Sequence, residues 1–178
     1  IIPFWTSIVV RTYAWKIMLG SRGMVNYLLT EMNLLDDPIR FLYTGTAVVI
    51  GLIHVHLPFI ILPLYASIEK INPYLEEAAQ DLGANRFKTF FRVTFPLSFP
   101  GLSIGSLLVF ILSTGSFLTP ALLGGPSEIM ISNVIEREYY MSFNWPFGSA
   151  LAILLLFIIL TLIFIYNQVF KIEKIAGE

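Results

Sequence analysis

Two histidines are the side chains of this sequence best suited to bind a metal ion or to carry a proton. His54 and His56 lie in a stretch that has no Asp, Glu, Lys or Arg between Arg40 and Glu69. Residues two positions apart on a helix point to nearly opposite faces, so one metal ion cannot bind both rings. The sequence has no cysteine, which excludes disulfides and thiolate metal sites. We therefore expect no metal site, and we expect both histidines to be hydrogen-bonded or interfacial.

A glycine pair followed by proline, Gly124-Gly125-Pro126, is the other stretch whose composition could suggest chemistry. A phosphate-binding loop needs a Lys-Ser or Lys-Thr pair after its glycines, and none follows here. A turn is the better interpretation. The sequence also shows no Ser/His/Asp set that would support an intramembrane hydrolase. We expect no catalytic residue and no ATP site in this chain, which we interpret as a non-enzyme.

The elements that hold these residues are membrane helices. Hydrophobic residues make up 56% of the chain and charged residues 13%, with a mean hydropathy of +0.77. A soluble domain carries about 25% charged residues. Three intervals have no Asp, Glu, Lys or Arg, namely those between Arg40 and Glu69, Arg92 and Glu128, and Glu138 and Lys171. Each exceeds the ~20 residues that cross a bilayer, which predicts an all-α integral membrane protein. The net charge of −1 and the lack of a basic run do not favour nucleic-acid binding.

The whole chain, 1–178, is predicted to form one transmembrane domain. The expected spans cover about residues 1–19, 41–66, 100–119 and 147–170. The first span is partial, and the opening Ile1–Val10 has neither the basic start nor the cleavage site of a signal peptide. We interpret it as the end of a helix that begins upstream, so that the chain is N-terminally truncated. Met24–Leu29 is expected to be an interfacial helix within the connector 20–40.

Basic residues predict the orientation of the spans. Loop 67–99 and the C-terminal tail together hold six Lys and Arg residues, against three in the connectors 20–40 and 120–146. Cytoplasmic loops carry the excess of basic residues. Loop 67–99 and the C-terminus are therefore expected on the cytoplasmic side.

The loop 67–99 contains a helix–turn–helix pattern. Asn72-Pro73 is typical of a helix start, and Gly83 suits the left-handed conformation that ends a helix. A second helix is expected from Asn85 to a stop at Pro96. The first helix would place its apolar residues on one face and its polar residues on the other. The apolar set is Leu75, Ala78, Ala79 and Leu82, and the polar set is Glu76, Glu77, Gln80 and Asp81.

This loop resembles the EAA loop of ABC importer permeases, which has Glu-Ala-Ala, three residues, Gly, nine residues and then Ile-x-Leu-Pro. Here Glu77-Ala78-Ala79 and Gly83 match with that spacing, and Val93-Thr94-Phe95-Pro96 replaces the ending. We refer to residues 73–96 as the EAA segment. Four further stretches are similar to the spermidine/putrescine branch of these permeases: residues 3–15, 62–73, 121–135 and 144–152.

The resemblance implies a partial type I ABC importer permease fold in a bacterial inner membrane. It implies three kinds of partner: a cytoplasmic ABC ATPase dimer, a second homologous permease and an extracytoplasmic solute-binding protein. ATP and Mg²⁺ would be bound by the ATPase, and this chain would bind no cofactor. Helix 73–82 would be the coupling helix. The residues expected to couple to the ATPase are Glu76, Glu77, Ala78, Ala79, Leu82, Gly83 and Pro96.

The resemblance also suggests a polyamine substrate, and carboxylates and aromatic faces attract cations. The substrate-path candidates are Trp5, Tyr13, Glu136, Glu138 and Trp145. Alternatively, Glu128, Glu136 and Glu138 belong to a solvated loop with an interfacial aromatic belt, or to a surface that docks the binding protein.

Other functions stay open at this point. The substrate could be another small solute, such as an amino acid, an opine, iron or sulfate, since related permeases carry these. A different class is a secondary transporter or channel that works without ATP. Such proteins usually carry ionisable residues inside their spans. In the predicted spans after the first, the two histidines are the only ionisable residues among His, Asp, Glu, Lys and Arg.

Overall fold

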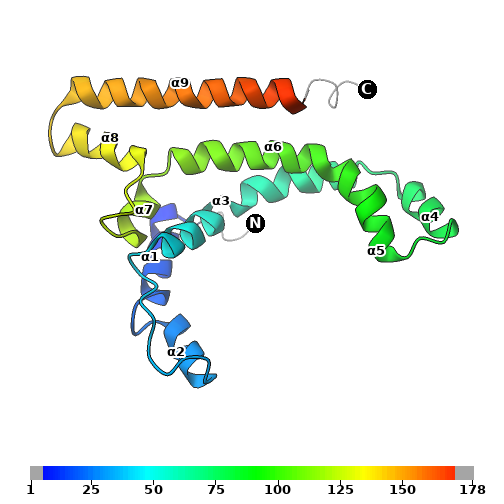
Figure 1. Cartoon of the computed structure of the whole chain (residues 1–178), viewed down its shortest axis with the longest axis horizontal. Helices are drawn as coiled ribbons and strands as arrows, with labels where there is room; N and C mark the ends of the chain where they lie inside the picture. Colours follow the sequence, from blue (N-terminus) through cyan, green and yellow to red (C-terminus); the bar gives the residue numbers. More distant parts are fainter. Residues whose placement is uncertain (1–5, 171–178) are drawn as a thin grey trace. The chain divides into compact units, whose positions relative to one another are not determined.

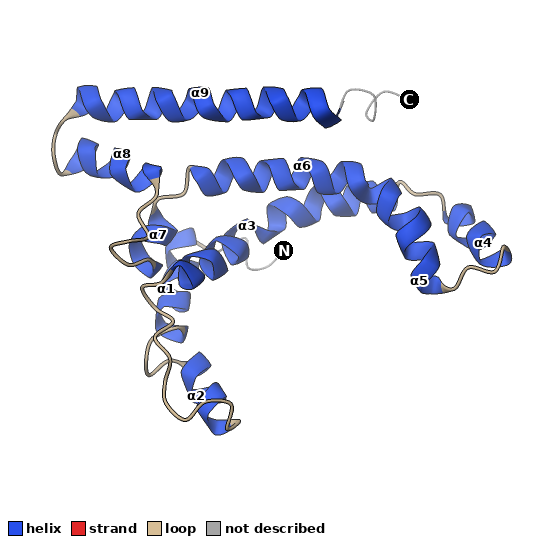
Figure 2. Cartoon of the chain, in the orientation of Figure 1, coloured by secondary structure: helices blue, strands red, loops and turns tan. Residues whose placement is uncertain are grey.

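A computed structural model of the protein describes residues 6–170, and that part consists of helices and connecting loops without strands (Figures 1 and 2). Three helical stretches are long and apolar enough to cross a membrane: Gly45–Glu69, Arg86–Thr114 and Trp145–Gln168. The predicted all-α membrane fold is confirmed. The elements in order are α1 Ile8–Met18, α2 Met24–Glu31, α3 Gly45–Glu69, α4 Pro73–Asp81, α5 Arg86–Thr89, the π-helix η2 Phe90–Thr94, α6 Phe95–Thr114, α7 Leu118–Leu123, α8 Ile131–Tyr140 and α9 Trp145–Phe170.

The chain divides into two compact units. The first comprises residues up to His56 together with Leu112–Leu160, and the second comprises Leu57–Ile111 together with the residues from Thr161 on. In the first unit α1 packs against α7 and α2, and α7 packs against α8. Leu19, Ala47, Val48 and Leu123 form a buried apolar cluster in this unit. Through these side chains, the start of α3 and the end of the short helix α7 pack against the residue that follows α1.

Polar side chains brace the connectors of the first unit. Asn26 is 2% exposed, and its amide donates to the carbonyls of Gly20 and Ile39 and accepts from the Ile39 N–H. The Ser132 hydroxyl donates to the Ser116 carbonyl at 2.7 Å, which ties α8 to the segment after α6. Such bonds satisfy backbone groups that have no partner within a helix.

In the second unit α3 and α6 approach closely at glycines. A Cβ on Gly101 would lie 2.5 Å from the Pro63 carbonyl oxygen, and one on Gly105 would lie 2.9 Å from the Cα of Ile60. The backbones of the two helices are thus in direct contact at these positions. Small residues permit this approach between membrane helices, as the Gly101–Gly105 spacing suggests.

The expected helix stop at Pro96 is wrong. Pro96 lies within α6, and the helix continues from Arg86 to Thr114 through the π turn of η2. The Phe95 N–H bonds to the Phe90 carbonyl, five residues back. This wider turn lies directly ahead of Pro96, at the place where the ring of a proline in a regular α-helix would meet the carbonyl four residues back. The helix therefore passes Pro96 without ending.

Several predicted boundaries also change. The third span ends at Thr114 and not near residue 119, and residues 120–146 hold α7 and α8 where a plain connector was expected. Within the first predicted segment, α1 has 11 residues, too few to span a bilayer, while residues 1–5 lie outside the described part. The predicted interfacial segment 24–29 is the helix α2. The helices α3 and α9 cover the predicted second and fourth spans, with bounds that differ from the predicted ones by a few residues.

The close approach at Gly105 predicts a position-specific effect. We expect Gly105→Val to lower the stability of the full-length subunit, because overpacking of a tight contact costs roughly 1–3 kcal/mol. The measurement is thermal unfolding in mild detergent. The matched control is Ser106→Val, one position along α6, where the side chain is exposed. Equal melting temperatures for both variants would show that α3 and α6 do not pack at Gly105.

Candidate functional site

The first arm of the EAA segment is α4, and its ends are set by local hydrogen bonds. At the start, the Asn72 Oδ1 atom accepts from the Tyr74 N–H at 3.1 Å, and Pro73 occupies the first turn. At the end, the Ala84 N–H donates to the Ala79 carbonyl and the Gly83 N–H to the Gln80 carbonyl. This pair of bonds is the Schellman arrangement, which needs a left-handed residue. Gly83 has φ +83°, as predicted for the residue that stops this helix.

The second arm begins at Asn85, whose Oδ1 atom accepts from the Lys88 N–H at 2.9 Å. From there α5 and η2 run directly into α6. Phe87, Phe90, Phe91 and Phe95 form a chain of ring contacts along this arm, with centroids 4.8–6.2 Å apart. Phe87 is 72% exposed and Phe90 and Phe91 about half exposed, so much of this aromatic surface is open.

The two arms pack against each other, since α4 contacts both α5 and η2. The Glu76 Oε1 atom accepts a hydrogen bond from the Thr94 hydroxyl at 2.7 Å. Glu76 and Ala79, three positions apart, are the partly buried residues of α4. The sequence pattern placed Glu76 on the polar face of α4, but the structure turns it toward the second arm. Sequence reasoning missed Thr94 because the π turn changes the helical periodicity at this point.

The opposite side of α4 is exposed. Leu82 is 90% exposed, Tyr74 73% and Leu75 47%, and Glu77 and Ala78 are also exposed. We call Tyr74, Leu75, Glu77, Ala78 and Leu82 the outer face of α4. Of the residues expected to couple to an ATPase, this face holds Glu77, Ala78 and Leu82. Glu76 and Ala79 lie toward the second arm, and Pro96 lies in α6.

Both histidines have hydrogen-bonding partners, as predicted. The Trp15 Nε1–H donates to the His54 Nδ1 atom at 2.7 Å. The His56 Nδ1 atom lies 3.0 Å from the Leu52 carbonyl and 3.4 Å from the Ser113 hydroxyl. No group of three or more His, Cys, Asp or Glu residues suited to a metal ion occurs within residues 6–170.

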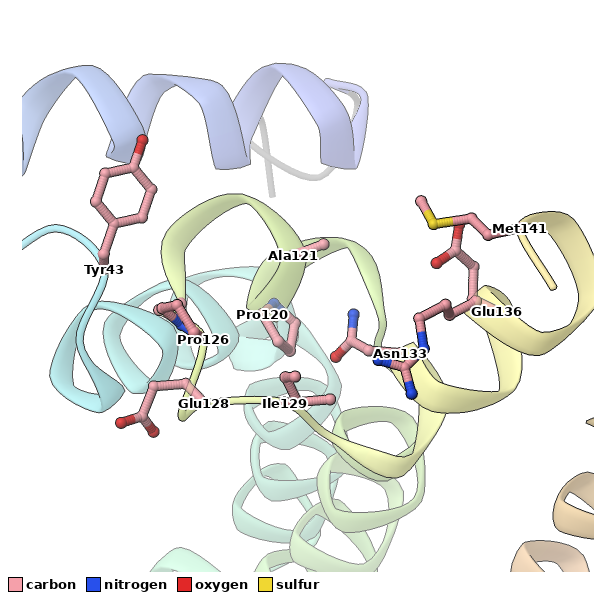
Figure 3. Close-up of a pocket in the computed structure, with 12 residues that line it drawn as sticks. Tyr43, Pro120, Ala121, Pro126, Glu128, Ile129, Asn133, Glu136 and Met141 are labelled. Atoms are coloured by element: carbon pink, nitrogen blue, oxygen red, sulfur yellow. The ribbon is translucent and has the colours of Figure 1, made fainter.

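A cavity of about 430 Å³ lies in the first unit between α7, α8 and Tyr43. One wall is Gly124-Gly125-Pro126, a turn closed by the Glu128 N–H on the Gly125 carbonyl, which confirms the predicted turn. Figure 3 shows Glu128 and Glu136 at separate ends of the cavity, so the two carboxylates do not converge. The full lining is Tyr43, Pro120, Ala121, Gly124, Gly125, Pro126, Glu128, Ile129, Asn133, Glu136, Arg137 and Met141.

The substrate-path candidates are dispersed. Of the four that the structure describes, Glu136 lines the cavity. The Glu138 Oε1 atom lies 3.9 Å from the Arg137 Nε atom, and the Trp145 indole N–H donates to the Tyr139 carbonyl. The Lys16 ammonium lies 5.7 Å from the centre of the Tyr13 ring, which places a positive charge on a face predicted to attract cations. Trp5 lies outside the described residues.

Comparison with known proteins places this geometry in a family. Residues 3–172 match the family described as "Binding-protein-dependent transport system inner membrane component". The chain belongs to this family. The family's description as an inner-membrane component agrees with the three long apolar helices found within residues 6–170.

Individual relatives agree with that assignment. The chain is 48% identical over 172 residues to the spermidine/putrescine transport system permease protein PotB of Haemophilus influenzae, covering 97% of this chain and 60% of that protein. It is 42% identical over 166 residues to PotB of Escherichia coli, covering 93% of this chain and 60% of that protein. The chain thus spans about 60% of the length of these curated relatives.

A solved structure shares the fold. A bacterial ABC transporter involved in the import of the acidic polysaccharide alginate superposes with a TM-score of 0.74, over 99% of this chain and 64% of that one. At 24% identity, this likeness shows the fold alone. It confirms the predicted ABC importer permease architecture.

The left-handed turn at Gly83 yields a test within the EAA segment. A Cβ here would meet open space, so a substitution is limited by the backbone conformation and not by a clash. We expect Gly83→Val to weaken the α4 stop by roughly 1–2 kcal/mol and to lower uptake by the full-length transporter while membrane insertion persists. The measurement is uptake by cells, normalised to the amount of inserted subunit.

The matched control at this position is Gly83→Asn, because asparagine adopts the left-handed region more readily than other residues with a side chain. Uptake should be largely retained in that variant. Normal uptake by the Gly83→Val variant would show that transport does not need the left-handed turn at residue 83.

Proposed function

We propose that this chain is the membrane-spanning part of a permease subunit in an ATP-driven ABC importer, and that the importer carries polyamines. The observation that carries the proposal is the outer face of α4. Leu82, exposed at 90%, caps the end of a short helix that also carries the exposed Glu77 and lies between two membrane spans. An exposed apolar surface of this kind suits a protein partner. We propose an ABC ATPase as this partner, because the chain belongs to a family of transport components and shares its fold with a bacterial ABC transporter.

The chain topology supports a cytoplasmic position for α4. Residues 70–85 follow the end of α3, whereas the cavity elements flank the start of α3, the end of α6 and the start of α9. If these helices span the membrane, the two regions emerge on opposite sides. Loop 67–99 and the C-terminal tail together hold six Lys and Arg residues, against three in the connectors 20–40 and 120–146. The excess of basic residues favours a cytoplasmic α4.

The proposed mechanism is alternating access driven by rigid-body motion. Two ATPase subunits bind ATP and Mg²⁺ and close, and each moves the α4-type helix that it holds. Glu77 is exposed in the middle of α4 and can accept a charge-assisted hydrogen bond from the ATPase, whereas the acidic residue of the first turn, where the helix dipole favours negative charge, is Glu76. The second arm continues into α6, so that the motion reaches a span directly.

A polyamine is the proposed substrate because of the two PotB relatives at 42–48% identity. The extracytoplasmic binding protein would deliver it on the side of the cavity, where Glu128 and Glu136 supply negative charge and Arg137 opposes it. We propose that selection of the solute lies mainly in the binding protein, since the carboxylates of this cavity do not form one site (Figure 3).

The proposal is tested by purifying the tagged full-length subunit from its own host in mild detergent and identifying its companions by mass spectrometry. We expect an ABC ATPase, a second permease and a solute-binding protein. The reconstituted complex should take up spermidine or putrescine with ATP inside the liposome. Sulfate, iron and amino acids should not compete.

Recovery of the subunit alone, even after crosslinking in cells, would contradict the importer proposal and favour a channel or a secondary transporter. Recovery of the full complex with uptake of a different solute would keep the importer and overturn the polyamine assignment.

A further inference from the structure

The hydrogen bond between Glu76 and Thr94 has a consequence beyond the packing of two short helices. It joins a side chain in the first turn of α4 to the last residue of η2, 18 positions later and directly before α6. Glu76 and Thr94 are both partly buried, whereas Glu77 and Ala78 beside Glu76 are exposed. The bond is therefore shielded on the inner side of the EAA segment, away from the outer face of α4.

A π turn separates Thr94 from Thr89, the other threonine of the second arm. In an α-helix, residues five apart are separated by about 140° around the axis. Thr89 and Thr94 are five apart, and the wider π turn between them brings them closer to a common side. Thr89 is 3% exposed and its hydroxyl donates to the Asn85 carbonyl, within its own arm. Of these two threonines, Thr94 is the one whose hydroxyl donates a hydrogen bond to α4.

We propose that Glu76 and Thr94 form a latch that fixes α4 to the start of span α6, so that the EAA segment moves as one rigid lever. This inference rests on the proposed function. Without the latch, α4 is held to α6 by the turn at residues 82–85 and by the packing of the two arms. A push on the outer face of α4 would then bend this turn and would not displace the span. Glu76 and Thr94 are positioning residues, because they act through α6 and touch neither ATP nor the transported solute.

The test uses the full-length transporter in proteoliposomes and measures solute uptake and ATP hydrolysis in the same sample. Thr94→Val removes the hydroxyl at similar volume. Because this hydroxyl bonds a carboxylate, its loss removes one of the stronger kinds of hydrogen bond, and we expect the solute moved per ATP to fall about tenfold. ATP hydrolysis and assembly with the ATPase should change less than about twofold, because the outer face of α4 is intact. A role in stability alone would lower both activities together.

Matched variants separate the latch from the general effect of losing a threonine. Thr89→Val makes the same substitution five residues earlier, where the lost hydrogen bond lies within one arm, and should keep near-normal uptake per ATP. Thr94→Ser restores a hydroxyl and should recover most of the coupling. Thr94→Val combined with Glu76→Ala should be no worse than the more impaired single variant, because the two residues share one interaction.

The latch is overturned if Thr94→Val and Thr89→Val have equal uptake per ATP, or if the effects of Glu76→Ala and Thr94→Val simply add. Failure of the proposed function is recognised separately. In that case the unmodified transporter already shows no uptake that depends on ATP, before any substitution is made.

Discussion

The interior of a membrane supplies no water to backbone groups, and each N–H and C=O in a span must find its partner within the protein. This constraint shapes the described chain. Pro58, Pro63 and Pro100 each remove a donor inside long helices that nevertheless continue. The helix also continues past Pro96, which follows the π turn of η2. The consequence is mechanical, because the second arm of the EAA segment is the beginning of a span and not a separate loop element.

Two units of the chain carry different properties. The second unit holds the EAA segment and the glycine contact of α3 with α6, a set suited to receiving and transmitting motion. The first unit holds the cavity beside α7 and α8, and its charges of both signs do not form one cation site. This division fits a permease in which force and solute enter at different places and the solute is chosen by another protein.

The sequence predicted what depends on local pattern. The caps at Asn72 and Asn85, the left-handed Gly83 and the long apolar spans all follow from single residues or periodicity. It failed where tertiary context decides. A proline usually ends a helix, and nothing in the sequence announces the π turn that carries α6 past Pro96. Thr94 lies at the end of that turn, where the period of a regular helix does not hold, so helical periodicity did not pair it with Glu76. Helices α7 and α8 were missed because α7 has only 6 residues and α8 mixes charged with apolar residues, so that neither resembles a span.

The central claim is that the outer face of α4 contacts an ATPase on the cytoplasmic side. The most direct measurement is photocrosslinking in living cells, with a photoreactive amino acid in place of Leu82 in the full-length subunit. Tyr140, which is 74% exposed at the end of α8, serves as the comparison position. If the outer face of α4 contacts the ATPase, the ABC ATPase is captured from position 82 and not from position 140. Capture of the ATPase from position 140, or capture of a solute-binding protein from position 82, would contradict it.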